Sequence, residues 1–344
     1  MKILVTGGAG YIGGTVAGLL TEKGHEALIF DNLSHANRNL LPAGVAFVDG
    51  ELADRAALEH IFRDARSRNQ PFDGVLHFAA LIEAGESMRY PELYFRNNTA
   101  STLSLLEAML ACGPRRLVFS SSAAVYGEPE SVPIQEDARL QPTNAYGASK
   151  LLVEHMLAWL NRIHGLRYAS LRYFNVAGAP EGPHGVTRGE AHDPETHLIP
   201  LILDAALGRR KSVHIYGDDY PTPDGTCIRD YIHVCDLADA HLLALEALDA
   251  ALGPAADPAY NFRPLIYNLG NGQGFSVREV IESARRVTGY PIQAEVHPRR
   301  PGDSAVLVAS SQKAVRELGW KPRYTQLDDI VRTAWLWHQK HYAT

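Results

Sequence analysis

The sequence predicts an α/β protein built on a doubly wound parallel sheet, with a smaller α+β region in its C-terminal half. Three observations support this class: short uninterrupted runs of Val, Ile and Leu, amphipathic stretches between them, and a glycine-rich turn directly after the first run. Continuous apolar runs are typical of strands buried on both faces, with helices covering each side of a parallel sheet. The predicted strands are Ile3–Val5, Ala27–Phe30, Val45–Val48, Gly74–Phe78 and Leu117–Ser120.

The alternation continues through a helix over Ala145–His164 and a strand over Tyr168–Tyr173, and then changes. Residues Gly178–Glu195 are rich in Gly, Pro, His and acidic residues, which predicts a long loop. Further helices are predicted at Leu198–Leu207, Cys235–Leu248, Val277–Thr288 and Leu327–His341, and a surface insertion at Ala250–Ala259. We therefore expect a sheet domain over residues 1–177 and a second region over residues 178–344, with some of the later chain crossing back to the sheet.

Length and composition exclude several classes of protein. The chain has 344 residues, of which 46% are hydrophobic and 21% charged, enough for about two cores at roughly 150 residues per domain. The net charge of −6 argues against nucleic-acid binding, and a pair such as Arg299 with Arg300 is too short to form a basic patch. Three cysteines without CxxC spacing favour a reducing cytoplasm over a disulfide framework or zinc site. Neither a signal-peptide pattern nor an apolar run of ~18 residues is present, so no membrane association is expected.

The first strand runs into the sequence TGGAGYIG, which places Gly7, Gly10 and Gly13 at three-residue spacing. Glycines at such a turn let backbone amides approach a pyrophosphate, and the following helix directs its positive N-terminus at the same anion. Asp31 ends the next strand, close to the spacing of about 20 residues at which an acidic side chain binds the ribose hydroxyls. Such a carboxylate would repel a 2′-phosphate, which favours NAD over NADP. The alternative is an ordinary tight turn beside a solvated carboxylate.

The GxxGxxG spacing resembles the extended short-chain dehydrogenase/reductase superfamily, a group with a Rossmann-type sheet. In that group the segment His77-Phe78-Ala79-Ala80 would pass the cofactor, Asn97 would hold that loop, and Glu51 and Leu52 would lie around the adenine. The cofactor-binding residues that the resemblance implies are Gly7, Gly10, Tyr11, Ile12, Gly13, Asp31, Asn32, Glu51, Leu52, Phe78, Ala79, Ala80, Asn97, Ser120, Tyr146, Lys150 and Phe174.

Tyr146 and Lys150 lie one helical turn apart in NAYGASK, so their side chains share a helix face. A phenol titrates near pH ~10, and a neighbouring ammonium, together with the positive nicotinamide of NAD, can lower that pKa toward the range of a useful base. Lys150 would also hold the nicotinamide ribose. Ser122 ends the strand just upstream, at the sheet edge where ligands of doubly wound folds bind, and can hydrogen-bond a reacting sugar oxygen. The competing interpretation is a chance YxxxK on a surface helix.

Two alanines follow Ser122, and they narrow the reaction type. Related sugar-nucleotide 4,6-dehydratases carry an acid/base pair of carboxylates where this chain has Ala123 and Ala124. Expulsion of water requires a base for one proton and an acid for the leaving hydroxyl, and alanine can supply neither. Dehydration is therefore disfavoured, as is the decarboxylase branch that resembles it, and hydride exchange at a sugar carbon is left.

The segments SSSAAVYG, NAYGASK, LRYFNVAGA, IYGDDYPTPDGTCIRDYIHVCDLADAH and RRPGD together resemble the UDP-glucose 4-epimerases over nearly the whole chain. The resemblance implies the substrate-binding residues Ser122, Tyr146, Asn175, His197, Leu198, Tyr216, Arg229, Arg300, Asp303 and Leu307. Two guanidiniums suit a diphosphate, and Tyr216 suits the uracil ring. For each arginine the alternative is a surface ion pair with Asp230 or Asp303.

The resemblance also implies a mechanism and an assembly. Tyr146 would take the proton of the sugar 4-hydroxyl while C4 delivers a hydride to NAD, the 4-ketose would turn, and the hydride would return to its other face. UDP-galactose and UDP-glucose would then interconvert, with NAD bound throughout. A homodimer is expected through apolar helices such as Leu103–Leu110 and Leu151–Leu160, with burial inside the monomer as the alternative.

Three departures from well-known members leave the substrate range open. Ile82 replaces a lysine near the cofactor, His197 replaces an asparagine before the uracil-binding leucine, and Leu307 bounds the sugar pocket where a tyrosine would exclude N-acetylated sugars. The alternatives are a C4-epimerase of UDP-N-acetylhexosamines or UDP-uronates, and a non-catalytic NAD-sensing regulator, which retention of Tyr146 and Lys150 disfavours.

A histidine-rich segment in the long loop carries side chains of the kinds that bind metals. Loop composition and uneven spacing predict a solvated face and no metal. The residues concerned are His184, His192, Asp193, Glu195 and His197.

Overall fold

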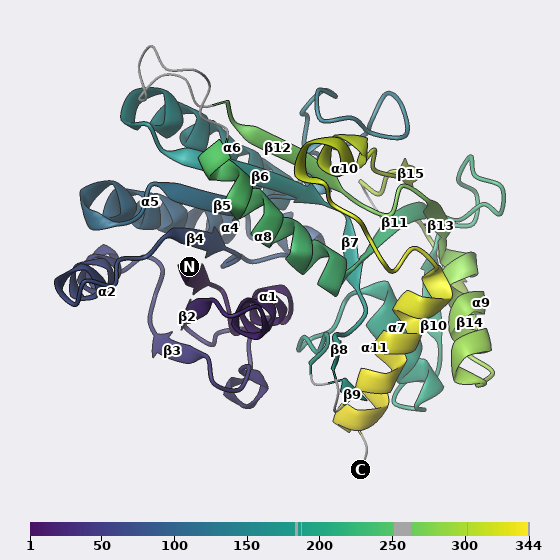
Figure 1. The fold of residues 1–344 in the computed structure, drawn as a ribbon. Helices are drawn as coiled ribbons and strands as arrows, with labels where there is room; N and C mark the ends of the chain where they lie inside the picture. The colour runs from purple at the N-terminus through teal and green to yellow at the C-terminus, as the bar shows by residue number, and fades with distance from the viewer. Residues whose placement is uncertain (183–184, 187, 251–262, 301, 343–344) are drawn as a thin grey trace.

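A seven-stranded parallel sheet forms the centre of the molecule (Figure 1). The computed structural model describes residues 1–182, 185–186, 188–250, 263–300 and 302–342. The strands are β1 (Lys2–Thr6), β2 (Glu26–Asp31), β3 (Ala46–Asp49), β4 (Gly74–His77), β5 (Arg116–Ser120), β6 (Arg167–Tyr173) and β12 (Leu265–Leu269), in the spatial order β12-β6-β5-β4-β1-β2-β3. The predicted doubly wound class is therefore confirmed, and the last strand comes from the C-terminal half of the chain. The strand order reverses between β1 and β4, which is where ligands bind in such folds.

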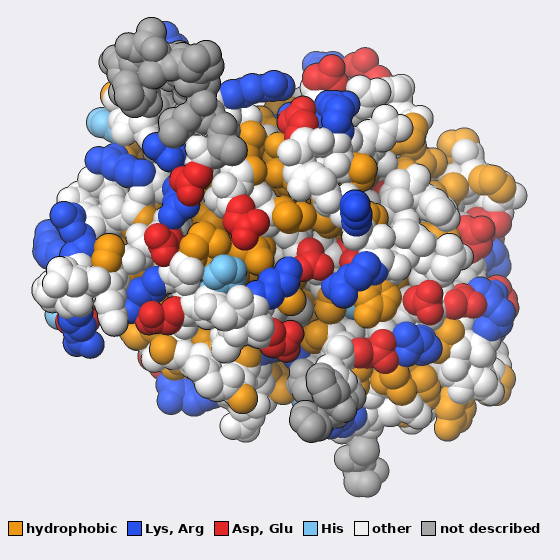
Figure 2. All heavy atoms as spheres, viewed as in Figure 1, with side chains coloured by type: hydrophobic (Ala, Val, Ile, Leu, Met, Phe, Trp, Pro, Cys, Tyr) orange, Lys and Arg blue, Asp and Glu red, His pale blue; other side chains and the backbone are white. Residues whose placement is uncertain are grey.

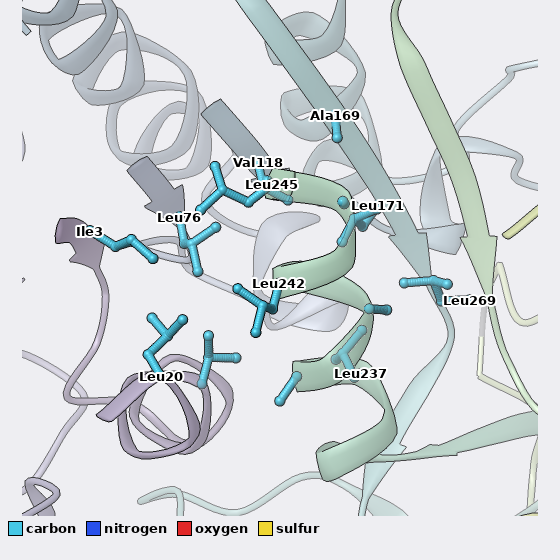
Figure 3. Packing of buried hydrophobic residues seen from close by; sticks show 14 of the residues in the cluster. Ile3, Leu20, Leu76, Val118, Ala169, Leu171, Leu237, Leu242, Leu245 and Leu269 are labelled. Atoms are coloured by element: carbon cyan, nitrogen blue, oxygen red, sulfur yellow. The ribbon is translucent and has the colours of Figure 1, made fainter. Parts of the chain in front are cut away.

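Helices cover both faces of this sheet. On one face lie α1 (Tyr11–Glu22) and α8 (Val234–Ala250), and on the other α2 (Arg55–Ser67), α5 (Ser101–Cys112) and α6 (Ala145–His164). Helix α8 crosses the sheet from the C-terminal half and packs beside α1 (Figure 1). Figure 3 shows its leucines meeting the strands and α1. The labelled side chains are Ile3, Leu20, Leu76, Val118, Ala169, Leu171, Leu237, Leu242, Leu245 and Leu269.

The smaller C-terminal region has its own apolar core at the carboxyl edge of the sheet. Its helices are α7 (Leu198–Ala206), α9 (Val277–Thr288) and α11 (Leu327–Tyr342). Strand β10 (Val213–Tyr216) pairs with β14 (Ala294–His297), and β11 (Ile228–His233) pairs with β7 (Asn175–Ala177), β13 (Gly274–Ser276) and β15 (Val306–Leu307). The predicted helices Ala145–His164 and Val277–Thr288 match α6 and α9 residue for residue.

Short elements complete the chain. They are η1 (Arg38–Leu40), α3 (Ala84–Ser87), α4 (Pro91–Tyr94), the π-helical η2 (Phe95–Ala100), η3 (Ala123–Val125), β8 (Glu181–Gly182), β9 (Gly185–Val186) and α10 (Gln312–Leu318). Of the insertion expected at Ala250–Ala259, the structure describes only Ala250, which ends α8. His184 also lies outside the described residues. Within the described ranges, no helix has the length and apolar character needed to cross a membrane. On the face in Figure 2, the coloured basic and acidic side chains are interspersed rather than gathered by sign.

A buried ion pair fixes α6 against the sheet. Glu154 lies on the α6 face that also carries Tyr146 and Lys150, and its carboxylate accepts hydrogen bonds from Arg172 of β6 at 2.6 and 3.0 Å. The two side chains are 6% and 2% exposed. Ser121, at the end of β5, donates to the same carboxylate at 2.6 Å. Glu154 therefore ties α6 to β6 through Arg172 and to the end of β5 through Ser121, the residue next to Ser122.

The first prediction concerns this ion pair. Arg172→Leu leaves the Glu154 carboxylate buried and unpaired, and should lower the free energy of unfolding by about 3–5 kcal/mol in a urea titration. Arg172→Leu combined with Glu154→Leu should cost less than Arg172→Leu alone, because no uncompensated charge remains. Arg55→Leu, at an exposed ion pair, serves as the control and should leave the midpoint unchanged. A double variant less stable than the single one would contradict the assignment.

Candidate active site and nucleotide pocket

The glycine-rich turn packs directly against neighbouring backbone and leaves no room for side chains at Gly7 and Gly13. Gly7 has a φ of +72°, and a Cβ there would overlap the backbone of Ala79 after β4. A Cβ on Gly13 would overlap the carbonyl of Gly7. Helix α1 begins at Tyr11 with Gly10 as its N-cap, so no side chain occupies the free amides of its first turn. These amides and the positive end of the helix are suited to an anion.

Asp31 is held beside this turn at the end of β2. Its carboxylate accepts hydrogen bonds from the backbone N–H of Ala9 at 3.0 Å and of Leu33 at 2.8 Å. Asn32 donates to both carboxylate oxygens of Glu51 at 3.0 and 3.1 Å. A carboxylate fixed next to an anion-binding turn is the arrangement that recognises a ribose joined to a diphosphate.

One arginine that the sequence analysis missed lies on the glycine turn. Arg188 is 5% exposed and its Nη1 donates to the carbonyls of Gly10 at 3.2 Å and Ala9 at 3.4 Å. Its Nη2 is buried and finds no hydrogen-bond partner among the described residues. Burial lowers the pKa of this guanidinium to about 10, so it stays charged at neutral pH. A buried, unsatisfied cation beside the free amides of α1 fits the diphosphate of a dinucleotide.

The loop after β4 is held by Asn98 rather than by Asn97, which corrects the expectation from the sequence. Asn98 accepts from the N–H of Leu81 at 2.8 Å and donates to its carbonyl at 2.9 Å. Asn97 donates to Asn98 Oδ1 at 3.0 Å. Both residues lie in the π-helical η2, whose extra residue per turn directs Asn98 toward the loop and buries it. At the start of the same loop, the N–H groups of Phe78 and Ala79 donate to Thr6 O at 2.9 and 3.1 Å.

The predicted catalytic residues meet at the carboxyl end of β5. Ser122 caps η3 and its Oγ accepts from the N–H of Ala124 at 3.1 Å. Tyr146 is in the first turn of α6, and the Ser122 side chain is near enough to its phenol to lower the pKa of that phenol. Lys150 is buried one turn further along, with its Nζ 5.9 Å from the centroid of the Tyr146 ring. This Nζ donates to the carbonyl of Ser120 at 2.8 Å.

The electrostatics of this group differ from the expectation that Lys150 lowers the pKa of Tyr146. Burial raises the pKa of the Tyr146 phenol, and the Ser122 side chain opposes that shift. Burial also lowers the pKa of Lys150 to about 7. The ammonium is directed at the Ser120 carbonyl rather than at the phenol, so the chain alone does not favour the phenolate. A further positive charge at the site is needed for Tyr146 to act as a base near neutral pH.

Two aromatic residues extend this edge of the sheet. The hydroxyl of Tyr173, which the sequence analysis did not select, shares a hydrogen bond of 2.6 Å with Ser120 Oγ. Phe174 is buried in an apolar cluster with Ala123 and Val125, and Leu307 packs against the same cluster. Leu307 pairs with Arg229 between β15 and β11, which brings the residue expected to bound the sugar pocket close to the strand of the nucleotide pocket.

A cavity of the smaller region brings together seven of the predicted substrate residues. They are Asn175, His197, Leu198, Tyr216, Arg229, Arg300 and Asp303. The same cavity is lined by residues that the sequence analysis missed, among them Glu190, Arg210, His214 and Tyr231. Of these, Arg210 could have been suspected from the sequence as a ligand for an anionic substrate, because it lies in the basic run RRK after α7. Leu307 is adjacent to this cavity through its strand and does not line it.

The two cavity arginines are held differently. The guanidinium of Arg300 stacks on the ring of Tyr216, with 3.8 Å between its Cζ and the ring centroid. Arg229 donates to Ser304 O at 2.8 Å and lies 3.6 Å from a carboxylate oxygen of Asp303. The ion pair considered as an alternative for Arg229 therefore exists, but it lies inside the cavity rather than on the outer surface. Both cations remain available to a diphosphate.

The histidine-rich segment is not the solvated face expected from its composition. Glu190 and Glu195 have side chains that are 9% and 11% exposed, and both histidine rings of the segment face them. The surrounding carboxylates raise the pKa of His192 to about 9 and that of His197 well above its ordinary value, against the effect of burial. Asp193, by contrast, is exposed. Four ligand-bearing side chains, Glu190, His192, Glu195 and His197, thus lie together in one short segment.

Comparison with known proteins identifies the family. Residues 3–270 match the NAD dependent epimerase/dehydratase family. A UDP-glucose 4-epimerase of Streptomyces lividans is 53% identical over 99% of this chain and 97% of its own length. The crystal structure of UDP-glucose 4-epimerase from Bifidobacterium longum in complex with NAD⁺ and UDP superimposes with a TM-score of 0.89 at 37% identity, covering 100% of this chain and 99% of the other. The UDP-Glc/GlcNAc 4-epimerase of Campylobacter jejuni gives 0.80 at 38% identity, over 98% and 99%. The chain belongs to the NAD dependent epimerase/dehydratase family, within the group that contains the UDP-glucose 4-epimerases.

Proposed function

We propose that the protein interconverts UDP-galactose and UDP-glucose by inverting C4 of the sugar, with NAD as a bound cofactor. One observation carries this function. Ser122 and Tyr146 come together beside the buried Lys150, at the carboxyl edge of the sheet, which is flanked by a dinucleotide-type turn and by the cavity with Arg229 and Arg300. A similar protein of 53% identity carries the name UDP-glucose 4-epimerase, which supports the same reaction.

The cofactor-holding residues follow from the geometry of the turn. The amides of Tyr11 and Ile12 and the guanidinium of Arg188 are the groups for the diphosphate, and Asp31 is the group for the adenine ribose. We assign the remaining contacts to Gly7, Gly10, Gly13, Asn32, Glu51, Leu52, Phe78, Ala79, Ala80, Asn97, Ser120, Tyr146, Lys150 and Phe174. Arg188 offers the positive charge that is missing at Ile82.

When bound, NAD would supply the hydride acceptor and hydride donor of the cycle, which would then need no outside oxidant. Tyr146 takes the proton of the 4-hydroxyl and gives it back, and Ser122 holds the 4-oxygen in line with the phenol. Lys150 can hold the nicotinamide ribose through its ammonium. Because C4 has to be attacked from both faces, UDP must stay anchored while the sugar turns.

The cavity supplies that anchor. Arg229 and Arg300 are the diphosphate groups, Tyr216 and Leu198 line the side for the uracil, and Asn175 with Asp303 supplies further polar contacts. His197 stands at the N-cap of α7 and lines the same wall. Inversion at C4 requires that the UDP end of the substrate is anchored while the sugar end is free to turn.

Dehydration remains disfavoured for this chain. Ala124 contributes its backbone N–H to Ser122, and Ala123 packs in the apolar cluster of Phe174. Neither side chain can remove the one proton or donate the other that loss of water requires. Two alternative functions are a C4-epimerase of other UDP-sugars and a sensing role without catalysis. Leu307 is intermediate in size between residues that exclude and admit N-acetylated sugars, and a sensing role would leave the protein without turnover.

The second prediction tests the reaction. Purified protein incubated with UDP-galactose and no added NAD should form UDP-glucose, measured by anion-exchange chromatography. UDP-N-acetylgalactosamine and UDP-galacturonate serve as parallel substrates. Absence of product from every sugar, even with NAD supplied, would overturn the proposal in favour of a sensing role. Product from the N-acetyl or uronate sugars alone would reassign the substrate.

The third prediction tests the base. Tyr146→Phe removes the group that exchanges the proton and should lower kcat by roughly 10²–10⁴-fold with little change in the Kd for the UDP-sugar. Tyr290→Phe, at an exposed tyrosine in the loop after α9, is the matched control and should behave as the wild type. Near-normal turnover in Tyr146→Phe would rule out its role as base.

The fourth prediction uses the lowered pKa of Lys150. Its folded pKa of about 7 lies below the ordinary 10.5, so between these pH values the unfolded chain binds a proton that the folded chain has released. Stability of the cofactor-free wild type therefore rises with pH across this window. Lys150→Met should unfold at a higher temperature than the wild type near pH 7, with the gain shrinking toward pH 10, and should lose most turnover. A gain that is equal at both pH values, or a gain in the exposed control Lys321→Met, would contradict this account.

We also propose a homodimer in the cytoplasm. The packed helices α5 and α6 carry exposed apolar side chains at Leu103, Leu152, Trp159 and Ile163, 41%, 43%, 61% and 57% exposed. Such a patch suits a second copy of the chain. All three cysteines are free thiols, which supports a reducing compartment.

The fifth prediction tests this patch. Trp159→Glu should convert the dimer to a monomer in sedimentation velocity, because a charge on the apolar face opposes burial. Tyr290→Glu, at another exposed aromatic residue in the loop after α9, should leave the mass unchanged. A monomeric wild type would refute the dimer.

A further inference from the structure

Four ligand-bearing side chains meet in the segment that leads into α7. They are Glu190, His192, Glu195 and His197, and their ligand atoms all lie within 4.8 Å of one another. Glu190 and His197 also line the nucleotide cavity. The set is formed by one stretch of eight residues, so it needs no distant part of the chain to assemble.

The separations around His192 match a metal site more closely than hydrogen bonds, whereas those around His197 are compatible with either. His197 Nδ1 lies 3.0 Å from Glu190 and 3.2 Å from Glu195, and His192 Nδ1 lies 3.5 and 3.6 Å from the same two carboxylates. Tetrahedral ligands with bonds of about 2.0–2.1 Å to Zn²⁺ are separated by about 3.3 Å, the middle of this range. A charge-assisted N–H···O bond is shorter, about 2.7–2.9 Å.

The ring nitrogen of His192 gives an independent indication. His192 Nδ1 is buried, and no hydrogen-bond partner for it occurs in the part of the chain that the structure describes. A buried imidazole nitrogen without a partner costs free energy unless something binds it. Here that nitrogen faces two carboxylates at a distance that leaves room for an ion between them.

The carboxylate of Glu195 is oriented by the backbone. It accepts from the N–H groups of Thr196 at 2.8 Å, His197 at 2.9 Å and His192 at 3.2 Å. Thr196 in turn donates its hydroxyl to Glu83, in the loop after β4, at 2.6 Å. Such outer contacts fix the direction of a ligand before the ion binds.

We propose that Glu190, His192, Glu195 and His197 form a structural site for one divalent transition metal ion of the Zn²⁺ type. Two imidazoles and two carboxylates suit zinc and its neighbours rather than Ca²⁺ or Mg²⁺, which prefer sets of oxygen ligands. Four protein ligands close the coordination shell, which makes the site structural rather than catalytic. This metal site would form whichever sugar nucleotide the protein acts on.

The ion would clamp one wall of the nucleotide cavity. The ligands lie directly before Leu198, and Thr196 joins the same segment to the loop after β4. Loss of the ion should loosen this wall and raise the KM for the UDP-sugar several-fold, with a smaller change in kcat, since Ser122, Tyr146 and Lys150 stand on other elements.

A second group of ligand-bearing residues provides a matched control. His214, Glu295 and His297 also cluster, at the paired strands β10 and β14. That group has three members, its glutamate is exposed, and its His297–Glu295 separation is 3.9 Å. It is therefore the poorer site, and it tests whether any histidine cluster on this chain would bind an ion.

The experiment uses untagged protein stripped with a chelator and then titrated with Zn²⁺ or Co²⁺. One equivalent of Zn²⁺ should bind, measured by inductively coupled plasma mass spectrometry after gel filtration, and the Co²⁺ form should show the visible absorption of a tetrahedral ion. Retention of far less than one equivalent, or an octahedral Co²⁺ spectrum, would overturn the proposal and leave two His–Glu ion pairs.

Variants locate the ion. His192→Gln should weaken Zn²⁺ binding by roughly 100-fold or more, because even outer contacts of a metal site change affinity by 10–100-fold. His297→Gln should leave the stoichiometry and affinity as in the wild type. Equal retention of Zn²⁺ by His192→Gln and the wild type, or loss of Zn²⁺ from His297→Gln alone, would refute the assignment. If His192→Gln fails to fold, the Zn²⁺ titration of the wild type decides whether the site exists.

Discussion

The seating of α6 on the carboxyl ends of β5 and β6 is the constraint on which the site depends. Tyr146, Lys150 and Glu154 follow one another at single-turn spacing on the buried face of this helix. Glu154 is locked by Arg172 and Ser121, so the two functional side chains above it are held over the end of β5. A buried ion pair contributes little net stability, but it specifies one position for the helix. Here that position sets the contact between Tyr146 and Ser122.

The charges of the site are incomplete in the chain by itself. Lys150 and Arg188 are both buried cations whose pKa is lowered by loss of water, and one nitrogen of Arg188 is unpaired among the described residues. Tyr146 has its pKa raised by the same loss of water. Folding therefore bears an electrostatic cost that an anionic dinucleotide can offset, which is the usual relation between stability and function at a preorganised site.

Local patterns allowed most of the fold to be predicted, since buried parallel strands and amphipathic helices have distinct periods. The predicted bounds of α6 and α9 agree with the structure to the residue, and Asn175, Tyr216 and Arg229, which the family resemblance implied as substrate-binding residues, line one cavity. Features that depend on irregular backbone could not be predicted in this way. In the π-helical turn Asn98, rather than Asn97, holds the loop after β4, and Arg188 and Glu190 are buried although they lie in a segment of polar composition. The pKa of Lys150 follows from tertiary burial, which sequence spacing does not encode.

The central claim is that C4 is inverted by removal and return of its own hydrogen as a hydride. Conversion of UDP-galactose carrying deuterium at C4, followed by NMR of the product in ordinary water, tests it most directly. The account predicts that UDP-glucose retains the deuterium at C4, because the proton handled by Tyr146 is the one on oxygen. Exchange of the label with solvent would contradict the account and indicate that a base removes the C4 hydrogen as a proton.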